Sequence, residues 1–228
     1  MHEGHRDRVR KRFRQEGLDH FSDIQALELL LFYGIPRVDT NPIAHALLDR
    51  FGSLSQVLEA SPEELMKVPG VGENAALLLT LIPQMGRFYM VDRSSRVTIL
   101  QTLEQCADFL VPHFFGRKVE TVFILCLDAK CKLLCCKELG EGGPNSTGVS
   151  IRKIVETAIG VNAATVVLAH NHPSGLAVPS AEDIQTTRRI AHALQAVEIT
   201  LADHIIVADG DYVSIAMSDD RFRDCLLI

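Results

Sequence analysis

The stretch from residue 165 to residue 183 constrains the fold more than any other part of the chain. It begins with an apolar, largely β-branched run at 165–169, which is typical of a buried strand. Alternate residues of a strand point to the same face, so His170 and His172 are expected to converge. The residues at 173–175, Pro-Ser-Gly, then break the strand. The sequence therefore predicts two neighbouring histidines at the end of a core strand.

A helix start follows in the same stretch. Ser180-Ala181-Glu182-Asp183 has the S-x-x-D form of a helix amino terminus with Ser180 as the N-cap, and we expect the helix to run from 181 to about 196. Asp183 would then face the histidines from the first turn. Imidazole and carboxylate suit zinc, and three protein ligands leave a fourth position for water. These residues predict a catalytic zinc site, and the alternative is surface histidines beside an ordinary helix cap.

The joint pattern is His-x-His, seven residues, Ser, two residues and Asp, and it resembles the signature of the JAMM (MPN+) metalloprotease superfamily. The string HNHPSGLAVPSAEDI is similar, more narrowly, to the RadC-like (UPF0758) branch. The resemblance implies a zinc hydrolase of peptide, isopeptide or related amide bonds, with a cytidine-deaminase-like architecture. It implies His170, His172 and Asp183 as zinc ligands, Ser180 at the oxyanion, and a separate upstream glutamate as the base.

Residues 121–139 predict two strands joined at 128–130, and the glutamate is sought there. Glu138 is expected at the end of the second strand, before a glycine-containing loop, a position that resembles that of the glutamate in RadC-like proteins. We predict Glu138 as the base. Glu141 is the competitor, although a carboxylate in such a loop is usually solvated. The chain departs from its relatives at Ile151-Arg152-Lys153, where they tend to have Pro-Arg-Glu, and a functional role for that carboxylate would put activity here in doubt.

The expected mechanism follows from these parts. Zinc lowers the pKa of a coordinated water to about 7 and polarises a carbonyl. Glu138 takes a proton from the water and returns it to the leaving amine. Ser180 donates to the oxyanion while it accepts an N–H bond at the helix start.

Length and composition limit the remaining possibilities. The chain has 228 residues, 47% of them hydrophobic, which is enough for one or two packed cores without a disulfide or a structural metal to hold them together. A net charge of −6 argues against bulk nucleic-acid binding by the whole protein. The basic opening lacks an apolar signal region and no segment is expected to span a bilayer, so we expect a cytoplasmic location and reduced cysteines.

Four of the cysteines, at 126, 131, 135 and 136, cluster on the expected hairpin. A second metal site is the less favoured interpretation, because the spacings form no paired C-x-x-C and adjacent strand residues such as Cys135 and Cys136 point to opposite faces. Buried cysteines that act as small apolar side chains are the simpler interpretation.

The aminoterminal region predicts helices at 26–33 and 42–51, each followed by glycine, and another that begins at Ser61-Pro62. Val68-Pro69-Gly70-Val71-Gly72, followed by an apolar helix face at 73–81, resembles a helix-hairpin-helix module. In that module the glycines let backbone N–H groups approach a DNA phosphate. A structural hairpin or protein-binding module is the alternative, and the acidic Glu73 favours it.

A run of basic residues opens the chain, at Arg6, Arg8, Arg10, Lys11, Arg12 and Arg14. It either adds non-specific phosphate contacts or forms a solvated helix face. The patterning changes at 91–96, which we interpret as a linker between a helical domain at 1–95 and a hydrolase domain at 96–228.

The second domain should also contain a helix at 102–109, strands at 198–201, 204–208 and 212–215, and a turn at 209–211. His204 is expected to support the ligands or the core, and Asp203 is a weak candidate for the partner of a ligating histidine. The fold class predicted is thus α/β, a mixed sheet flanked by helices, with a small all-α aminoterminal domain.

Two functions remain open at this point. The first is a zinc hydrolase that acts on a protein or peptide-like substrate. The second is a DNA-associated accessory protein in which the metal site is structural or vestigial. The oligomeric state is not specified by the sequence.

Overall fold

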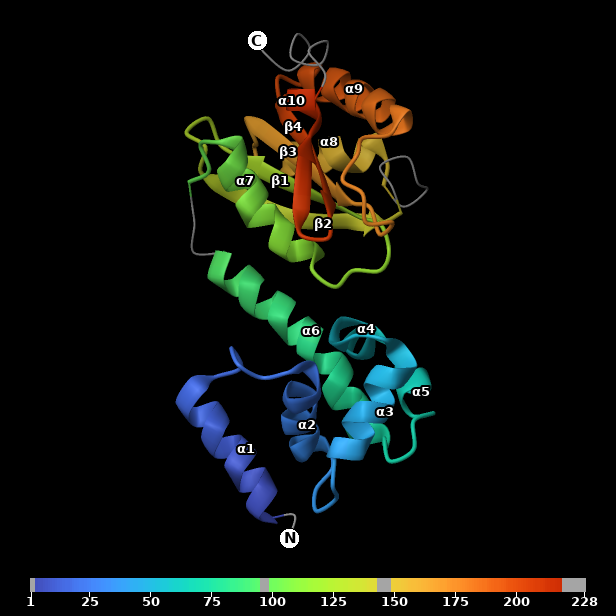
Figure 1. Ribbon diagram of the computed structural model, residues 1–228. Coiled ribbons are helices and arrows are strands. Elements are labelled where there is room, and N and C mark those ends of the chain that lie inside the picture. The colour runs from blue at the N-terminus through green and yellow to red at the C-terminus, as the bar shows by residue number, and fades with distance from the viewer. Residues whose placement is uncertain (1–2, 95–98, 143–148, 219–228) are drawn as a thin grey trace. The chain divides into compact units, whose positions relative to one another are not determined.

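The computed structural model describes residues 3–94, 99–142 and 149–218 (Figure 1). Its residues form two compact units, Met1–Gly86 and Arg87–Ile228. Each unit has its own hydrophobic core and is described by itself. The domain boundary at residue 95 stays a prediction.

The first unit is entirely helical. Its helices are α1 (Glu3–Glu16), α2 (Asp23–Gly34), α3 (Asn41–Phe51), α4 (Leu54–Glu59), α5 (Pro62–Leu65) and the first part of α6 (Glu73–Ser94). Serine hydroxyls cap three of them, because Ser22, Ser53 and Ser61 each accept a backbone N–H in the first turn. The core is formed by apolar side chains from α2 to α6, among them the fully buried Leu27, Leu31, Leu47, Leu65 and Leu79. The helices expected at 26–33, 42–51 and after Ser61 are confirmed.

The second unit is built on a mixed sheet of five strands. They are β1 (Thr121–Leu127), β2 (Leu133–Glu141), β3 (Thr165–Asn171), β4 (Thr200–Ala208) and β5 (Asp211–Ser214), in the order β2-β1-β3-β4-β5. β3 and β4 are parallel, and the other neighbours are antiparallel. The mixed α/β sheet flanked by helices is therefore confirmed.

Helices cover both faces of this sheet (Figure 1). On one face, α8 (Ile151–Gly160) and α9 (Ala181–Gln195) pack on alternate residues of β1 and β3, such as Ile124 and Leu168. On the other, α7 (Leu103–Leu110) and the 3₁₀ helix η1 (Val111–Phe114) pack on the intervening residues, such as Leu125 and Val167. A short α10 (Ile215–Ser218) follows β5. The two-residue period of the strands decides which side chains share a face with α9.

Three boundaries differ from the sequence-based expectation. β4 is one continuous strand, whereas two strands were expected on either side of residues 202–203; Asp203 is instead buried inside the strand. β2 continues through Gly140 to Glu141, so the expected loop begins later; its residues 143–148 lie outside the described part. α6 continues to Ser94, so residues 91–94 of the expected linker are helical, and 95–96 lie outside the described residues.

The two cores predict separate responses to core mutations. Leu125→Ala removes a fully buried side chain from the second unit and should lower its free energy of unfolding by about 2–5 kcal/mol. Leu47→Ala should do the same in the first unit. Amide hydrogen exchange under mildly denaturing conditions distinguishes the two variants, because each should lose protection from exchange mainly in the unit that carries the substitution. Equal loss in both units for either variant would contradict two independent cores.

Candidate metal centre

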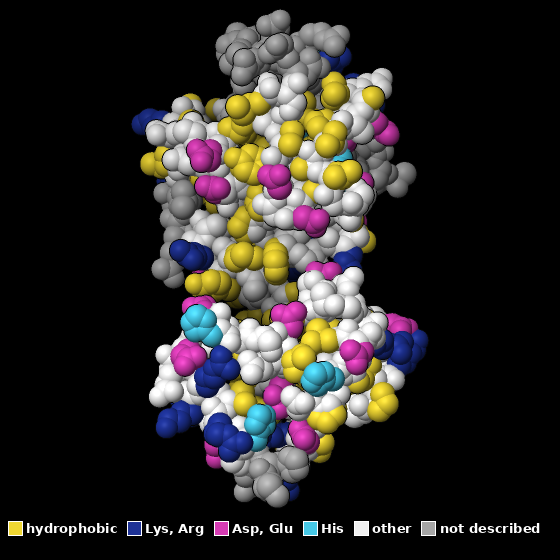
Figure 2. All heavy atoms as spheres, in the orientation of Figure 1, with side chains coloured by type: hydrophobic (Ala, Val, Ile, Leu, Met, Phe, Trp, Pro, Cys, Tyr) yellow, Lys and Arg dark blue, Asp and Glu magenta, His cyan; other side chains and the backbone are white. Residues whose placement is uncertain are grey.

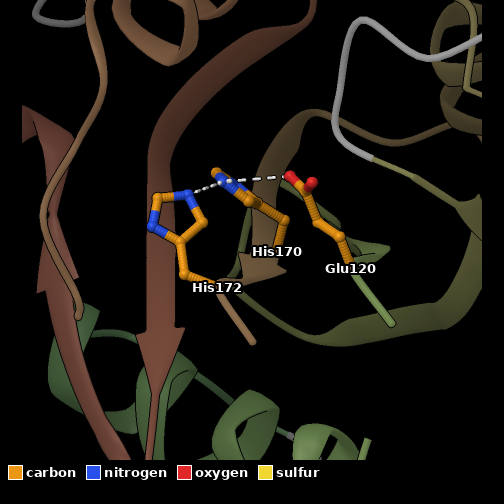
Figure 3. Close-up of side chains that lie close together, drawn as sticks. All are labelled: Glu120, His170 and His172. Carbon is orange, nitrogen blue, oxygen red and sulfur yellow. Dashed lines mark hydrogen bonds and ion pairs between the residues drawn. The ribbon is translucent and has the colours of Figure 1, made fainter. Parts of the chain in front are cut away.

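His170 and His172 meet at the carboxyl end of β3. They flank Asn171, which points to the opposite face, so both rings lie on the side of the sheet that α9 covers. Their Nε2 atoms are 2.9 Å apart, and the His170 side chain is fully buried (Figure 3). The convergence predicted from the His-x-His spacing is confirmed.

The chain after β3 fixes the orientation of the His172 ring. Gly175 adopts a positive φ of 84° in the turn that follows, and its N–H donates to the carbonyl of His172. The turn brings the carbonyl of Leu176 within 3.1 Å of His172 Nδ1. Because a carbonyl only accepts, Nδ1 must carry the proton, and Nε2 is left with its lone pair toward His170.

Asp183 completes this group from the first turn of α9. One carboxylate oxygen lies 3.3 Å from His170 Nε2 and the other lies 3.5 Å from His172 Nε2. The carboxylate also accepts bonds from the backbone N–H and the hydroxyl of Ser180. The first of these and the bond from the Asp183 N–H to the Ser180 hydroxyl form a capping box at the helix start. Burial disfavours the charge, but the neighbouring His170 ring and the hydrogen bonds from Ser180 outweigh it and hold the pKa of Asp183 below its ordinary value.

These donors fit a divalent cation. Two ligand atoms of a tetrahedral zinc site, each about 2.0–2.1 Å from the ion, lie about 3.4 Å apart. The separations of 2.9, 3.3 and 3.5 Å among the two histidines and Asp183 are close to that value. A cation that accepts lone pairs from both rings and from the carboxylate would hold these atoms at such distances.

A second carboxylate, Glu120, points toward the same histidines (Figure 3). One of its oxygens is 3.7 Å from His170 Nε2, and its side chain is 33% exposed, in contrast to 8% for Asp183. Glu120, His170 and His172 offer ligand atoms that all lie within 4.8 Å of one another. The site therefore has a fixed, buried carboxylate and a more accessible one.

Asn171 holds the backbone on both sides of Glu120. Its side-chain oxygen accepts the N–H of Thr121, and its amide nitrogen donates to the carbonyl of Val119. The residue between the two histidines thus fixes the segment that carries the glutamate. Sequence reasoning missed Glu120, and the available signal was its place directly before the apolar strand β1.

Glu138 and Ser180 make other contacts. Glu138 lies in β2, is 41% exposed and pairs with Arg117 at 2.7 Å. The Ser180 hydroxyl donates to Asp183 at 2.6 Å and accepts the Asp183 N–H, so its N-cap role is confirmed. Their roles as base and as oxyanion donor remain predictions.

The departure at 151–153 has a structural counterpart. Lys153, in the first turn of α8, donates from Nζ to the carbonyl of Leu139 in β2. The side chain that stands at the third position of this stretch therefore joins α8 to β2.

A third histidine lies behind the site. His204 of β4 is fully buried, and its Nε2 is 2.8 Å from His170 Nδ1. Burial lowers the pKa of His204 well below its ordinary value, and the neighbouring His170 lowers it further. Asp203, the candidate partner of a ligating histidine, instead accepts bonds from Ser214, Ala216 and the His204 backbone N–H. Asp203 was the wrong partner, because it points to the opposite face from His170.

The cysteines support the simpler interpretation. Cys126 is fully buried in one core, Cys135 packs against that core, and Cys136 packs against the core on the opposite face. Burial raises the pKa of Cys136 to about 12. Within the described ranges, no cysteine belongs to the group of side chains close enough together to hold a metal ion, which contains His170, His172 and Glu120.

In the aminoterminal unit, several of the first arginines are used within the fold. Arg6 donates to the carbonyls of Ile35 and Val38, and Arg12 bonds Glu16 and the His20 carbonyl. Dark blue basic and magenta acidic side chains are interspersed on the visible face of this unit (Figure 2). Gly70, in the expected hairpin, has a φ of 89°, a left-handed conformation that favours glycine without any contact to a phosphate. DNA binding by this unit remains a prediction.

Comparison with known proteins places this site in a family. Residues 100–220 match the model of the RadC-like JAB domain, and residues 3–77 match that of the UPF0758 N-terminal region. The chain belongs to the RadC-like JAB family. A UPF0758 protein of Fusobacterium nucleatum subsp. nucleatum is 33% identical over 93% of this chain and 94% of its own length. Another, from Paraburkholderia xenovorans, is 33% identical over 92% of this chain and 83% of its own.

This RadC-like JAB protein contains, in its described residues, no helix that is both long and apolar enough to cross a membrane. The relation of the JAB domain to the JAMM superfamily agrees with a cluster of side chains at the end of β3 that could hold a metal ion.

The geometry predicts one zinc ion per chain. Zinc should raise the unfolding temperature, because a ligand that binds only the folded state stabilises it by about 2.7 kcal/mol at 100 times its Kd. His172→Ala should abolish both zinc retention and this shift. His192→Ala, on the exposed face of α9, is the matched control and should change neither. Elemental analysis and thermal melts measure the two effects, and two ions per chain or full retention by His172→Ala would contradict the site.

Proposed function

We propose that this protein is a zinc-dependent hydrolase of peptide, isopeptide or related amide bonds. The observation that carries the proposal is the difference in burial and contacts between two carboxylates beside the histidines. Asp183 is buried and tied to Ser180 between the two histidines, whereas Glu120 is more exposed and lies beside them. Hydrolysis by a metal site needs both kinds of group, a fixed ligand and a base that can reach the attacking water.

His170, His172 and Asp183 are the residues that would hold the ion. Their nitrogen and oxygen donors suit zinc, and three protein ligands are typical of catalytic rather than structural sites. When bound, zinc supplies Lewis-acid chemistry, since it lowers the pKa of a coordinated water to about 7 and polarises a substrate carbonyl.

Glu120 is the residue that we assign to proton transfer. Its carboxylate takes a proton from the attacking water as the new carbon–oxygen bond forms, and it returns that proton to the amine nitrogen as the carbon–nitrogen bond breaks. Asn171 keeps the glutamate in reach because it binds the backbone on both sides of it. The Ser180 hydroxyl would have to turn away from Asp183 to donate to an oxyanion, a motion that its N-cap bond permits.

A peptide-like substrate is supported by the loop between His172 and Ser180. Leu176, whose carbonyl binds the His172 ring, is 68% exposed, and Val178 is 63% exposed. Apolar side chains at this position offer contact area to the residues that flank a scissile amide bond.

Glu120→Gln tests the proposal. The variant should keep its zinc and its fold and lose about 10²- to 10⁴-fold in hydrolysis, the usual contribution of general acid–base catalysis. A screen of peptide, isopeptide and small amide substrates supplies the assay. Zinc content and circular dichroism are measured on the same samples.

Glu138→Gln is the matched control, and it also tests the sequence-based choice of base. Glu138 lies in β2 and forms an ion pair with Arg117, so replacement of Glu138 should leave hydrolysis close to the level of the unaltered protein. A dead Glu138→Gln beside an active Glu120→Gln would reverse the assignment. Loss of zinc in Glu120→Gln would make Glu120 a ligand. A zinc-loaded protein that hydrolyses none of the substrates would favour the accessory role with a vestigial site.

A further inference from the structure

We infer that His204 is a positioning residue that sets the tautomer of His170. The Thr187 hydroxyl determines which ring nitrogen of His204 carries the proton. The inference rests on the proposed function in one respect, because it takes His170 Nε2 as the atom that binds the ion. It concerns a buried imidazole that the proposed mechanism does not use. The observations are a chain of hydrogen bonds and the chemistry of the atoms in it.

The chain of hydrogen bonds connects two of the proposed ligands through the core. His170 Nδ1 lies 2.8 Å from His204 Nε2, and His204 Nδ1 lies 2.6 Å from the Thr187 hydroxyl. That hydroxyl donates to the backbone carbonyl of Asp183 at 2.6 Å. His170, Thr187 and His204 are all fully buried, so water is not available as a substitute partner for any of these atoms.

The topology explains why these residues meet. β3 and β4 are parallel neighbours, and the register that pairs Leu168 with His204 puts His204 on the same face as His170. On α9, Thr187 follows Asp183 by one helical turn, so both face the sheet. A strand pairing and a helical turn thus bring together four groups from three separate elements, β3, α9 and β4.

The donor and the acceptor of each hydrogen bond follow from the group at the end of the chain, the Asp183 carbonyl. The Asp183 carbonyl can only accept, so the single hydroxyl proton of Thr187 is used there. Thr187 must then accept from His204, which places the His204 proton on Nδ1. A neutral His204 is left with a lone pair on Nε2, which accepts the Nδ1 proton of His170. His170 Nε2 is therefore free of a proton and points to His172 and Asp183.

The opposite direction would be incompatible with binding. If the His204 proton were on Nε2, His170 would have to accept it at Nδ1 and carry its own proton on Nε2. That proton would block the position of the ion. Full burial disfavours a doubly protonated His204, which would have the same effect. The Thr187 hydroxyl is the group that selects between these states.

Thr187→Val and Thr187→Ser form the test pair. Valine has nearly the shape of threonine but removes the acceptor for His204 Nδ1, so the zinc affinity should fall by about 10- to 100-fold, as is typical for loss of an outer hydrogen bond. Serine keeps the hydroxyl and should restore the affinity to near that of the unaltered chain. Affinity is measured by competition with a chromophoric zinc chelator on the full chain.

Nitrogen NMR of histidine-labelled full-length protein supplies a second readout that a purely structural role would not move. In the unaltered chain, both His170 and His204 should show the proton on Nδ1. A His204 proton on Nε2, or on both nitrogens, would overturn the inference even if Thr187→Val failed to fold. An unchanged zinc affinity in folded Thr187→Val would overturn it as well.

These outcomes are separate from those of the hydrolysis assay. If Thr187→Val weakens zinc binding but no substrate is cleaved, the positioning role stands and the hydrolase proposal fails. If hydrolysis is found and Thr187→Val binds zinc normally, the hydrolase stands and the positioning role fails.

Discussion

The site at the end of β3 depends on the close approach of His170 Nε2 and His172 Nε2, which both lack a proton in the tautomers that we infer. His172 uses its proton on the Leu176 carbonyl, which leaves its Nε2 facing that of His170 at 2.9 Å. Two lone pairs at this distance repel unless a cation lies between them, and the neighbouring Asp183, with its lowered pKa, adds negative charge rather than a proton. The surrounding hydrogen bonds are arranged so that the N–H groups of the two imidazole rings point away from the space between the rings and the carboxylate.

The sheet supplies this arrangement by combining antiparallel and parallel neighbours around one strand. β1 and β3 are antiparallel, and Val122 lies opposite His170. The segment just before β1 therefore passes the carboxyl end of β3. Glu120 lies there, and Asn171 holds it through the backbone. On the other side, the parallel β4 brings His204 behind His170. One strand end therefore receives a carboxylate from one neighbour and an imidazole from the other.

The local part of this site could be predicted from the sequence, and the part that depends on register could not. A strand period of two places His170 and His172 on one face, and the S-x-x-D pattern places Asp183 at a helix start, so short-range geometry was sufficient for all three. Glu120 is fifty positions upstream of His170, and its approach depends on how β1 pairs with β3, which no local pattern reports. Glu138 was chosen because β2 was expected to end there, whereas the strand continues to Glu141. The interruption expected between strands at 202–203 is also absent from β4, because three hydrogen bonds let Asp203 remain buried within the strand.

Metal binding and the packing of α9 are coupled in this design. The first turn of α9 carries the capping box of Ser180 and Asp183, and the next turn carries Thr187, which bonds both the Asp183 carbonyl and His204. A displacement of the helix start would therefore change the carboxylate and the histidine chain together. A ligand that binds only the correctly placed helix stabilises that placement by linkage, so an ion would tighten α9 on the sheet at the same time as it is held. The core beneath, with Ile190 and Leu194 of α9 against the sheet, keeps the rest of the helix fixed without the metal. We therefore expect the apolar core to hold the unit folded without an ion, and an ion to tighten the first turn of α9 against the end of β3.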